Sequence, residues 1–201
     1  MLQNEIILQY QKRIIDMILF LIVLVVTLPI SIITSVLIKL ESDGPIIYKQ
    51  ERVGRDGKVF SLYKFRSMRQ DAEKESGPIW AKENDPRVTR VGRIIRILRI
   101  DEIPQIFNVL KGDMSFIGPR PERPHFVNIL SSLIPQYKER HSLKPGITGL
   151  AAVKYKYGSS IEDSIEKFRY DLYYLENLSL LLDMVIIFKT IIVVFTGKGA
   201  R

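Results

Sequence analysis

The side chains best placed to do chemistry are the adjacent carboxylates of Asp101 and Glu102, at the start of an expected helix. A helix dipole keeps a carboxylate near the helix N-terminus ionised, and the free backbone N–H groups there favour phosphate. Arg120 and Arg123 follow in a proline-rich stretch, and a guanidinium matches phosphate oxygens two at a time. An ionised aspartate beside phosphate-binding arginines is what an aspartyl-phosphate mechanism needs.

The same residues allow a purely structural interpretation. Asp101 occupies a position typical of a helix N-cap, and Pro104 falls in the first turn, where proline is tolerated. In the chemical interpretation, Glu102 would help to hold a divalent cation that offsets the charge of a diphosphate. The spacing alone leaves both interpretations open.

Composition limits the other kinds of catalytic site. The 201 residues include no cysteine, which excludes disulfides, thiolate metal sites and a cysteine nucleophile. Only two histidines are present, His125 and His141, so a histidine-rich metal site is excluded and we expect both to be surface or packing residues. The length allows one compact domain with a sizeable core.

The chain is basic, with 30 Lys and Arg against 22 Asp and Glu and a formal charge of +8. Most of the excess falls in residues 41–150, so this part should face nucleic acid, phospholipid or a phosphate-bearing substrate. Residues 87–99 predict either a basic amphipathic helix on an anionic membrane surface or a solvated charged face. Their arginines are three apart, at Arg87, Arg90, Arg93, Arg96 and Arg99.

Residues 17–38 form an uncharged, strongly apolar segment. As a straight helix it would extend ~33 Å, enough to cross a hydrocarbon core of ~30 Å. Pro29 predicts a kink because it cannot donate to the carbonyl of Val25, and basic residues on both flanks favour leaving both ends in the cytoplasm. The segment is therefore expected to be membrane-embedded, either as a single span or as a bent helix that dips in and returns.

The rest of the chain alternates short elements with turns. Residues 44–68 predict two strands joined by a tight turn at Asp56-Gly57, and residues 160–176 carry apolar residues at helical spacing. Residues 178–195 form a second apolar stretch, interrupted by two charges, which predicts a core or interfacial helix. Glycine and proline predict loops or turns at residues 69–86, 111–124 and 143–150.

A series of motifs, in this order, resembles the bacterial sugar transferase family, the monotopic phosphoglycosyl transferases. The motifs are KRIID, a kinked apolar run, GPIIYKQERVG, LYKFRSM, DPRVTRVGRIIR, IDEIPQIFNVLKGDMSFIGPRP, LKPGITGL and YDLYYLENLSLLLD. The resemblance runs from Lys12 to about Thr190, which makes it far more specific than any single short motif.

The resemblance implies transfer of a sugar 1-phosphate from a UDP-sugar to polyprenol (undecaprenyl) phosphate, with release of UMP. This would be the first membrane step of exopolysaccharide, capsule, O-antigen or other glycan assembly. The family's Asp-Glu dyad falls on Asp101 and Glu102. Asp101 would attack the sugar-bearing phosphorus and hold a phospho-sugar covalently until the lipid phosphate attacks it, and Glu102 would help to bind Mg²⁺.

The family's Pro-Arg-Pro motif falls on Pro119, Arg120 and Pro121. By resemblance, Arg120 would be a phosphate ligand. The further candidates for contact with phosphate or with the membrane surface are Lys64, Arg66 and Arg90.

By the same resemblance we expect an α+β fold. A re-entrant helix-break-helix anchor, broken at Pro29, would cover residues 1–40, and a cytosolic or interfacial catalytic domain with interfacial amphipathic helices and a small β element would cover residues 41–201. The expected location is the bacterial inner (cytoplasmic) membrane, with the catalytic domain on the cytoplasmic face. The expected partners are a UDP-sugar, polyprenol phosphate and membrane lipids, without nucleic acid, and a homodimer is a further expectation because helix–loop membrane faces often pair.

The chain departs from the family pattern at two places. The anchor break has Leu28-Pro29 in place of Ser-Pro, so we expect Thr27 or Ser31 to supply the hydrogen bond of the missing serine. Residues 151–153 read Ala-Ala-Val where the family commonly has Ala-Gln-Val, so the donor sugar is not carried over. Larger members of the similar exopolysaccharide and capsule branch add an N-terminal multi-span region, so the chain is either a minimal enzyme or the catalytic portion of a longer protein.

Two other classes of function compete with the transferase. A membrane-anchored basic module would bind anionic lipid or nucleic acid without catalysis, through the arginines of residues 87–99. An inactive relative of the family would serve as a scaffold. The intact Asp101-Glu102 pair and Arg120 favour the enzyme over both.

Overall fold

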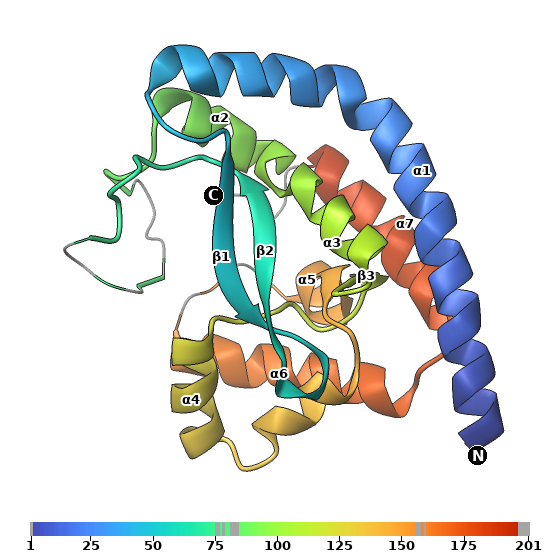
Figure 1. Ribbon diagram of the computed structural model, residues 1–201. Coiled ribbons are helices and arrows are strands. Elements are labelled where there is room, and N and C mark those ends of the chain that lie inside the picture. Colours follow the sequence, from blue (N-terminus) through green and yellow to red (C-terminus); the bar gives the residue numbers. More distant parts are fainter. Residues whose placement is uncertain are drawn as a thin grey trace.

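The computed structural model describes residues 2–74, 77, 79–80, 85–155, 158 and 160–196. A long helix, α1 (Leu2–Glu41), bends around one side of a body built from shorter helices and two small sheets (Figure 1). The expected mixture of helices with a small β element and one long apolar N-terminal helix is therefore confirmed.

Helix α1 continues through Pro29. The expected break is therefore replaced by a bend within one helix. Thr27 Oγ1 donates to the carbonyl of Val23 at 2.7 Å, and Ser35 Oγ donates to the carbonyl of Ser31 at 2.7 Å. Hydroxyl groups that bond the carbonyl four residues back bend a helix without ending it, and proline adds to the bend.

Both ends of α1 are fastened to the body. Near the N-terminal end, Lys12 Nζ pairs with Asp183 at 2.6 Å and Arg13 donates to the carbonyl of Val109 at 2.6 Å. Near the C-terminal end, Ile38 is buried in a hydrophobic cluster of the body. Between these points most of the apolar side chains of α1 are exposed, and its length and composition are sufficient to cross a membrane.

The end of α1 also caps the next helix, α2 (Arg90–Ile97). The Glu41 carboxylate accepts hydrogen bonds from the backbone N–H groups of Arg90 and Val91, at 2.7 and 3.1 Å, and the Thr89 hydroxyl forms the N-cap. These caps satisfy N–H groups that a helix start leaves without partners. They fix the start of α2 at Arg90, three residues after its arginine pattern begins.

Strands β1 (Ile47–Val53) and β2 (Val59–Phe65) form an antiparallel hairpin, as expected. The connection is a short 3₁₀ helix, η1 (Arg55–Gly57), in which Asp56 and Gly57 have φ of 55° and 75°. Aspartate and glycine tolerate this left-handed region, which explains the turn signal in the sequence.

A second sheet pairs β3 (Ser115–Ile117) with β4 (Gly146–Thr148) in parallel. Both strands lie in segments that we expected to contain only loops or turns, so that prediction was wrong. Each strand has three residues, which is too short for an alternating pattern to appear. The pairing also needs a close backbone approach, because a Cβ on Gly146 would lie 2.1 Å from the backbone nitrogen of Gly118.

The segment after α2 forms a 3₁₀ helix, η2 (Ile100–Gln105), that runs directly into α3 (Ile106–Lys111). The fully buried Asn108 joins these helices to the hairpin. Its side chain accepts from the N–H of Tyr63 at 3.0 Å and donates to the carbonyl of Ser61 at 2.8 Å. This link holds η2 at a fixed position against β2.

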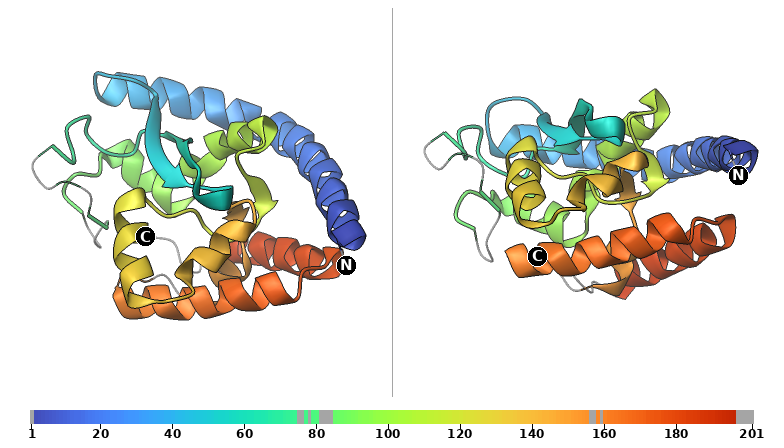
Figure 2. Two further views of the ribbon diagram at one scale, coloured as in Figure 1. Left: turned by 60° about the horizontal axis from the view of Figure 1, so that its bottom comes forward. Right: turned by 90° about the horizontal axis from the view of Figure 1, so that it is seen from below.

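The remaining helices are α4 (Pro124–Leu133), η3 (Tyr137–Ser142), α5 (Leu150–Lys154), α6 (Ile161–Glu176) and α7 (Leu180–Thr196). Helix α6 was expected, and a capping box between Ser160 and Asp163 starts it. It lies on the opposite side of the body from the second half of α1 (Figure 2). Helix α7 buries Ile186 and exposes Leu181 and Phe188, so it packs on the body with one face only.

Candidate active site

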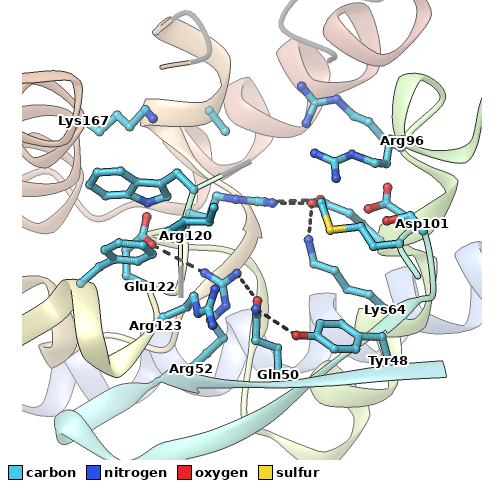
Figure 3. A pocket seen from close by; sticks show the side chains of 18 of the residues that line it. Tyr48, Gln50, Arg52, Lys64, Arg96, Asp101, Arg120, Glu122, Arg123 and Lys167 are labelled. Carbon is cyan, nitrogen blue, oxygen red and sulfur yellow. Dashed lines mark hydrogen bonds and ion pairs between the residues drawn. The ribbon is translucent and has the colours of Figure 1, made fainter. Parts of the chain in front are cut away.

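A cavity of about 930 Å³ lies among the hairpin, η2, the loop after β3 and α6. Figure 3 shows, on one side, Lys64, Arg96 and Asp101, and on the other side Arg52, Arg123 and Lys167. The side chain of Arg120 reaches between the two sides (Figure 3). A cavity with this many cationic side chains suits a substrate that carries several phosphate oxygens.

Asp101 lies in the first turn of η2 and not at its N-cap, which is Arg99. It is only 9% exposed, and none of the residues that the structure describes forms a hydrogen bond or an ion pair with its carboxylate. Burial raises the pKa of Asp101 to about 6, opposed by the charge of Lys64 and helped by that of Glu102. Asp101 is thus mostly ionised at neutral pH but more basic than an ordinary aspartate, because desolvation outweighs the charges of Lys64, Arg96 and Arg120.

Glu102 has the opposite environment. Its carboxylate binds Lys64 Nζ at 3.1 Å and both terminal N–H groups of Arg120, one of them at 3.3 Å. Burial by itself would raise the pKa of Glu102, but the charges of Arg120 and Lys64 outweigh it and hold that pKa well below its usual range. Two carboxylates adjacent in the sequence therefore differ, since one is paired with two cations and the other is not.

The Pro-Arg-Pro loop is held by its backbone. The carbonyl of Pro119 accepts a hydrogen bond from the N–H of Gly146 at 3.0 Å. The carbonyl of Arg120 accepts one from the Arg140 guanidinium at 2.8 Å, and the carbonyl of Pro121 accepts one from the Arg52 guanidinium at 2.8 Å. These bonds fix the loop without using the side chain of Arg120, which is 43% exposed and extends from the loop to Glu102. Arg120 thus presents its guanidinium to the cavity from a rigid support.

Sequence analysis did not identify Arg52 or Arg140. Arg140 is buried, pairs with Asp171 at 2.7 Å and donates to the Tyr137 hydroxyl at 2.6 Å. Arg52 lies in β1, Arg140 in η3 and Asp171 in α6. No spacing in the chain predicts them, because the network exists only once three distant segments meet.

The other expected binding residues lie in different settings. Arg66 lines the cavity, but its guanidinium donates to the carbonyl of Ser42 at 2.7 Å, just after α1, and so holds the end of the anchor. Arg90 is exposed at the start of α2 and is not among the described residues that line the cavity, so its contact with the membrane surface stays a prediction. His125 is exposed and His141 half-buried, and neither lines this cavity.

Helix α2 is amphipathic, as its sequence predicts. Arg96 lines the cavity, whereas Ile94, Ile97 and Leu98, at the end of the helix, are exposed. Helix α3 adds two exposed apolar side chains, Phe107 and Leu110. Helices α2 and α3, which flank η2 and Asp101 in the sequence, therefore expose apolar side chains, as α1 does.

The comparisons with known proteins are extensive. The chain matches the family described as bacterial sugar transferase over residues 7–197. It is 49% identical over 190 residues to the UDP-N-acetylgalactosamine-undecaprenyl-phosphate N-acetylgalactosaminephosphotransferase of Aeromonas hydrophila, a match that covers 94% of this chain and 45% of that protein. It is 41% identical over 197 residues to the exopolysaccharide production protein PSS of Rhizobium leguminosarum bv. phaseoli, covering 94% of this chain and 97% of that protein.

A further relative is the putative undecaprenyl-phosphate N-acetylgalactosaminyl 1-phosphate transferase of Bacillus subtilis, 58% identical over 129 residues that cover 64% of this chain and 72% of that protein. The chain thus spans less than half of the Aeromonas relative and nearly all of the Rhizobium relative. The family match includes the cavity, both carboxylates and the Pro-Arg-Pro loop. The chain belongs to the bacterial sugar transferase family, as its motifs indicate.

Proposed function

We propose that this chain transfers a sugar 1-phosphate from a UDP-sugar to undecaprenyl phosphate and releases UMP, through a covalent phospho-sugar intermediate on Asp101. The observation that carries the proposal is the contrast inside the dyad. Glu102 binds Lys64 and Arg120, whereas Asp101 is buried beside the same cations with no hydrogen bond or ion pair to any described residue. An ionised, desolvated carboxylate with a raised pKa is a competent nucleophile.

In the first step, an oxygen of the Asp101 carboxylate attacks the sugar-bearing phosphorus of the donor. A new P–O bond forms, and the bond from that phosphorus to the bridging oxygen breaks, so UMP leaves with the bonding electron pair. Arg120 and Lys64 stabilise the charge on the phosphoryl oxygens. To do so, both exchange part of their contact with Glu102 for contact with the donor.

In the second step, a phosphate oxygen of undecaprenyl phosphate attacks the same phosphorus. The bond between Asp101 and that phosphorus breaks, the carboxylate is restored, and undecaprenyl-diphospho-sugar is released. Neither step requires a net proton transfer. This agrees with a cavity that His125 and His141 do not line.

The position of α1 supports a re-entrant anchor. Lys12 and Ile38, near its two ends, contact the same body, and a helix with both ends on one side of a bilayer enters and leaves by the same face. Helix α1, which contains Pro29, is bent (Figure 1), and this allows the path. We propose that the body lies at headgroup level on the cytoplasmic face of the inner membrane, because basic residues flank the apolar segment on both sides. The lipid phosphate and the water-soluble donor then meet at Asp101.

Glu102 also fits a Mg²⁺ ion once Lys64 and Arg120 exchange part of their contact with it for contact with the donor. Mg²⁺ commonly binds through one or two carboxylates together with substrate phosphates. No group of three metal-binding side chains of the His, Cys, Asp and Glu types occurs in the described part of the chain, so the ion would need the donor diphosphate as a further ligand. Glu102 would hold the ion, which when bound offsets negative charge on the diphosphate.

The names of the relatives specify different sugars. N-acetylgalactosamine appears for the Aeromonas protein, and glucose for a Klebsiella pneumoniae UDP-glucose:undecaprenyl-phosphate glucose-1-phosphate transferase that is 41% identical over 191 residues. Both names specify a UDP-linked donor. We therefore propose a UDP-sugar and leave its identity to a panel that includes both.

The test is UMP release in nanodiscs that contain undecaprenyl phosphate and Mg²⁺, with a panel of UDP-sugars. The wild type is compared with Asp101→Asn and with Asp56→Asn, a matched control in the exposed hairpin turn, where asparagine tolerates the positive φ. We expect UMP from one donor with the wild type and the control, and none with Asp101→Asn. Intact-protein mass spectrometry without acceptor should show a gain of one phospho-sugar, absent in Asp101→Asn.

Normal turnover of Asp101→Asn would refute the covalent mechanism. Absence of UMP from every UDP-sugar, with folded and membrane-bound wild type, would refute the UDP-sugar reaction. Loss of turnover on chelation, restored by added Mg²⁺, is the expected behaviour for the proposed metal, and full activity in chelator would contradict it.

A further inference from the structure

Arg99 forms the corner between α2 and η2 with a left-handed backbone, at φ 57° and ψ 18°. Its N–H donates to the carbonyl of Arg96 at 3.1 Å, and its own carbonyl accepts from the N–H of Glu102 at 3.2 Å. The corner therefore fixes the start of η2. Its geometry is set by the backbone, and a backbone of this kind is the one that glycine adopts most easily.

An arginine at this corner is unexpected on stability grounds. The other non-glycine residue with positive φ in the described chain is Asp56, in an exposed turn, and aspartate visits this region readily. Arginine has no such tolerance. Non-glycine residues held in this conformation cluster at functional sites, where the side chain is needed despite the strain.

The side chain of Arg99 has a clear location. It lines the cavity together with Arg96 and Asp101, and it is two residues from the proposed nucleophile. The strained corner thus keeps the Arg99 side chain in the cavity that Asp101 also lines. Guanidinium groups at such positions bind phosphate oxygens in pairs.

The surroundings of Arg99 distinguish the two substrates. Ile97 and Leu98, immediately before it, are exposed, and α2 is joined to the apolar anchor through Glu41 and through the cluster that contains Ile38. A long hydrocarbon chain therefore has an apolar surface on this side. On the opposite side of the cavity, Arg123 lies over the Phe126 ring and pairs with Glu73 at 2.8 Å.

We propose that Arg99 binds the phosphate of the polyprenol phosphate acceptor, while the exposed end of α2 contacts the first part of its hydrocarbon chain. The ligand class is a phosphomonoester on a long apolar chain. The inference rests on the proposed function, because it assigns a residue to the second substrate of that reaction. Arg120 and the cations around it are left for the diphosphate of the donor.

The test compares Arg99→Gly with Arg93→Gly, a matched substitution within the neighbouring helix α2. Arg93 is exposed and does not line the cavity. We expect Arg99→Gly to raise the melting temperature by about 2–4 °C, because glycine relieves the left-handed strain. Arg93→Gly should lower it by a similar amount, because glycine disfavours a helix interior. Arg99→Lys keeps a charge without the planar fork.

Binding is measured without turnover, as the rise in melting temperature on titration with undecaprenyl phosphate, undecaprenol, inorganic phosphate or UDP-sugar. For the wild type and Arg93→Gly, undecaprenyl phosphate should protect at lower concentration than undecaprenol or inorganic phosphate. For Arg99→Gly the half-saturating concentration of undecaprenyl phosphate should rise at least about tenfold, and that of the UDP-sugar less than about twofold. The half-saturating concentration of undecaprenyl phosphate for Arg99→Lys should lie between those of the wild type and Arg99→Gly.

Wild-type affinity of Arg99→Gly for undecaprenyl phosphate would overturn the inference. So would equal weakening of both substrates together with a lower melting temperature, because Arg99 would then be structural. Protection by inorganic phosphate at the same concentration as by undecaprenyl phosphate would also overturn it, since the site would then bind free phosphate. Wild-type protein that binds undecaprenyl phosphate through Arg99 but releases no UMP would refute the proposed reaction and leave the binding assignment intact.

Discussion

Two buried aspartates line the same cavity from different helices, Asp101 of η2 and Asp171 of α6. Burial raises the pKa of both carboxylates, so desolvation does not distinguish them. Their partners do. Asp171 pairs with Arg140 at 2.7 Å, and Arg140 in turn holds the carbonyl of Arg120 at 2.8 Å, whereas Asp101 has no such bond to any described residue.

The comparison separates a supporting carboxylate from a reactive one. In a buried ion pair such as Asp171–Arg140, each side chain holds the other in place, and removing one leaves the other as an uncompensated charge. An unpaired buried carboxylate destabilises the fold and is available to attack. The proposed mechanism thus assigns different roles to Asp101 and Asp171, and five changes test this assignment.

The largest effect is expected for Asp101→Asn. Turnover should fall at least about a thousandfold, an increase in the barrier of about 4 kcal/mol, because the nucleophile is lost. The melting temperature should not fall, since none of the described residues loses a hydrogen bond or an ion pair with Asp101. UMP release and thermal unfolding of one preparation measure both. A large loss of stability without a large loss of turnover would reverse the assignment.

Asp171→Asn should act mainly on stability. It leaves the buried Arg140 without its counter-charge, which is expected to lower the free energy of unfolding by about 3–5 kcal/mol and the melting temperature by about 10 °C. Turnover below the new melting temperature should fall far less than in Asp101→Asn. An unchanged melting temperature would show that the fold does not need Asp171 to compensate the charge of Arg140.

Arg120→Lys keeps the charge and removes the planar fork. Because backbone bonds hold the loop, the substitution should leave the fold intact and lower kcat/KM for the donor by about 10–100-fold. Steady-state kinetics with the preferred UDP-sugar measure it. Wild-type kinetics would mean that a point charge beside Glu102 is sufficient.

The pH dependence follows from the raised pKa of Asp101, about 6 in the folded protein. The ionised form is the nucleophile, so kcat/KM should rise about tenfold from pH 5 to pH 7. For stability the sign is opposite: between the ordinary aspartate pKa and about pH 6 the folded state binds the extra proton, so this group destabilises the fold as pH rises. Asp101→Asn should remove that part of the pH dependence of unfolding, and an identical profile in the variant would contradict the assignment.

The smallest effect is expected for Glu166→Gln. Glu166 pairs with Arg169 at 2.7 Å, as closely as Asp171 pairs with Arg140, but the two side chains are 40% and 70% exposed. Exposed pairs contribute little, so the melting temperature should change by less than about 2 °C. A change as large as that of Asp171→Asn would show that pairing matters irrespective of burial.

Elements with a strong local signal were predictable. The apolar run of α1, the hairpin turn at Asp56-Gly57 and the start of α6 after Ser160 each follow from composition, turn chemistry or capping. The parallel pair β3 and β4 was not, because three-residue strands carry no period and their partner lies far along the chain. The contact that holds the end of α1 was also not predictable, since Arg66 reaches it from after β2.

The sequence by itself determined which chemical groups are present: the dyad, Arg120 between two prolines, an apolar anchor with basic flanks, and no cysteine. Only the tertiary structure decided that Glu102 pairs with two cations while Asp101 forms no hydrogen bond or ion pair with any described residue. Lys64 comes from β2 and Arg120 from the loop after β3, and both point to the same member of the dyad. Pairing and burial depend on which distant segments meet, and the spacing of residues along the chain does not contain that information.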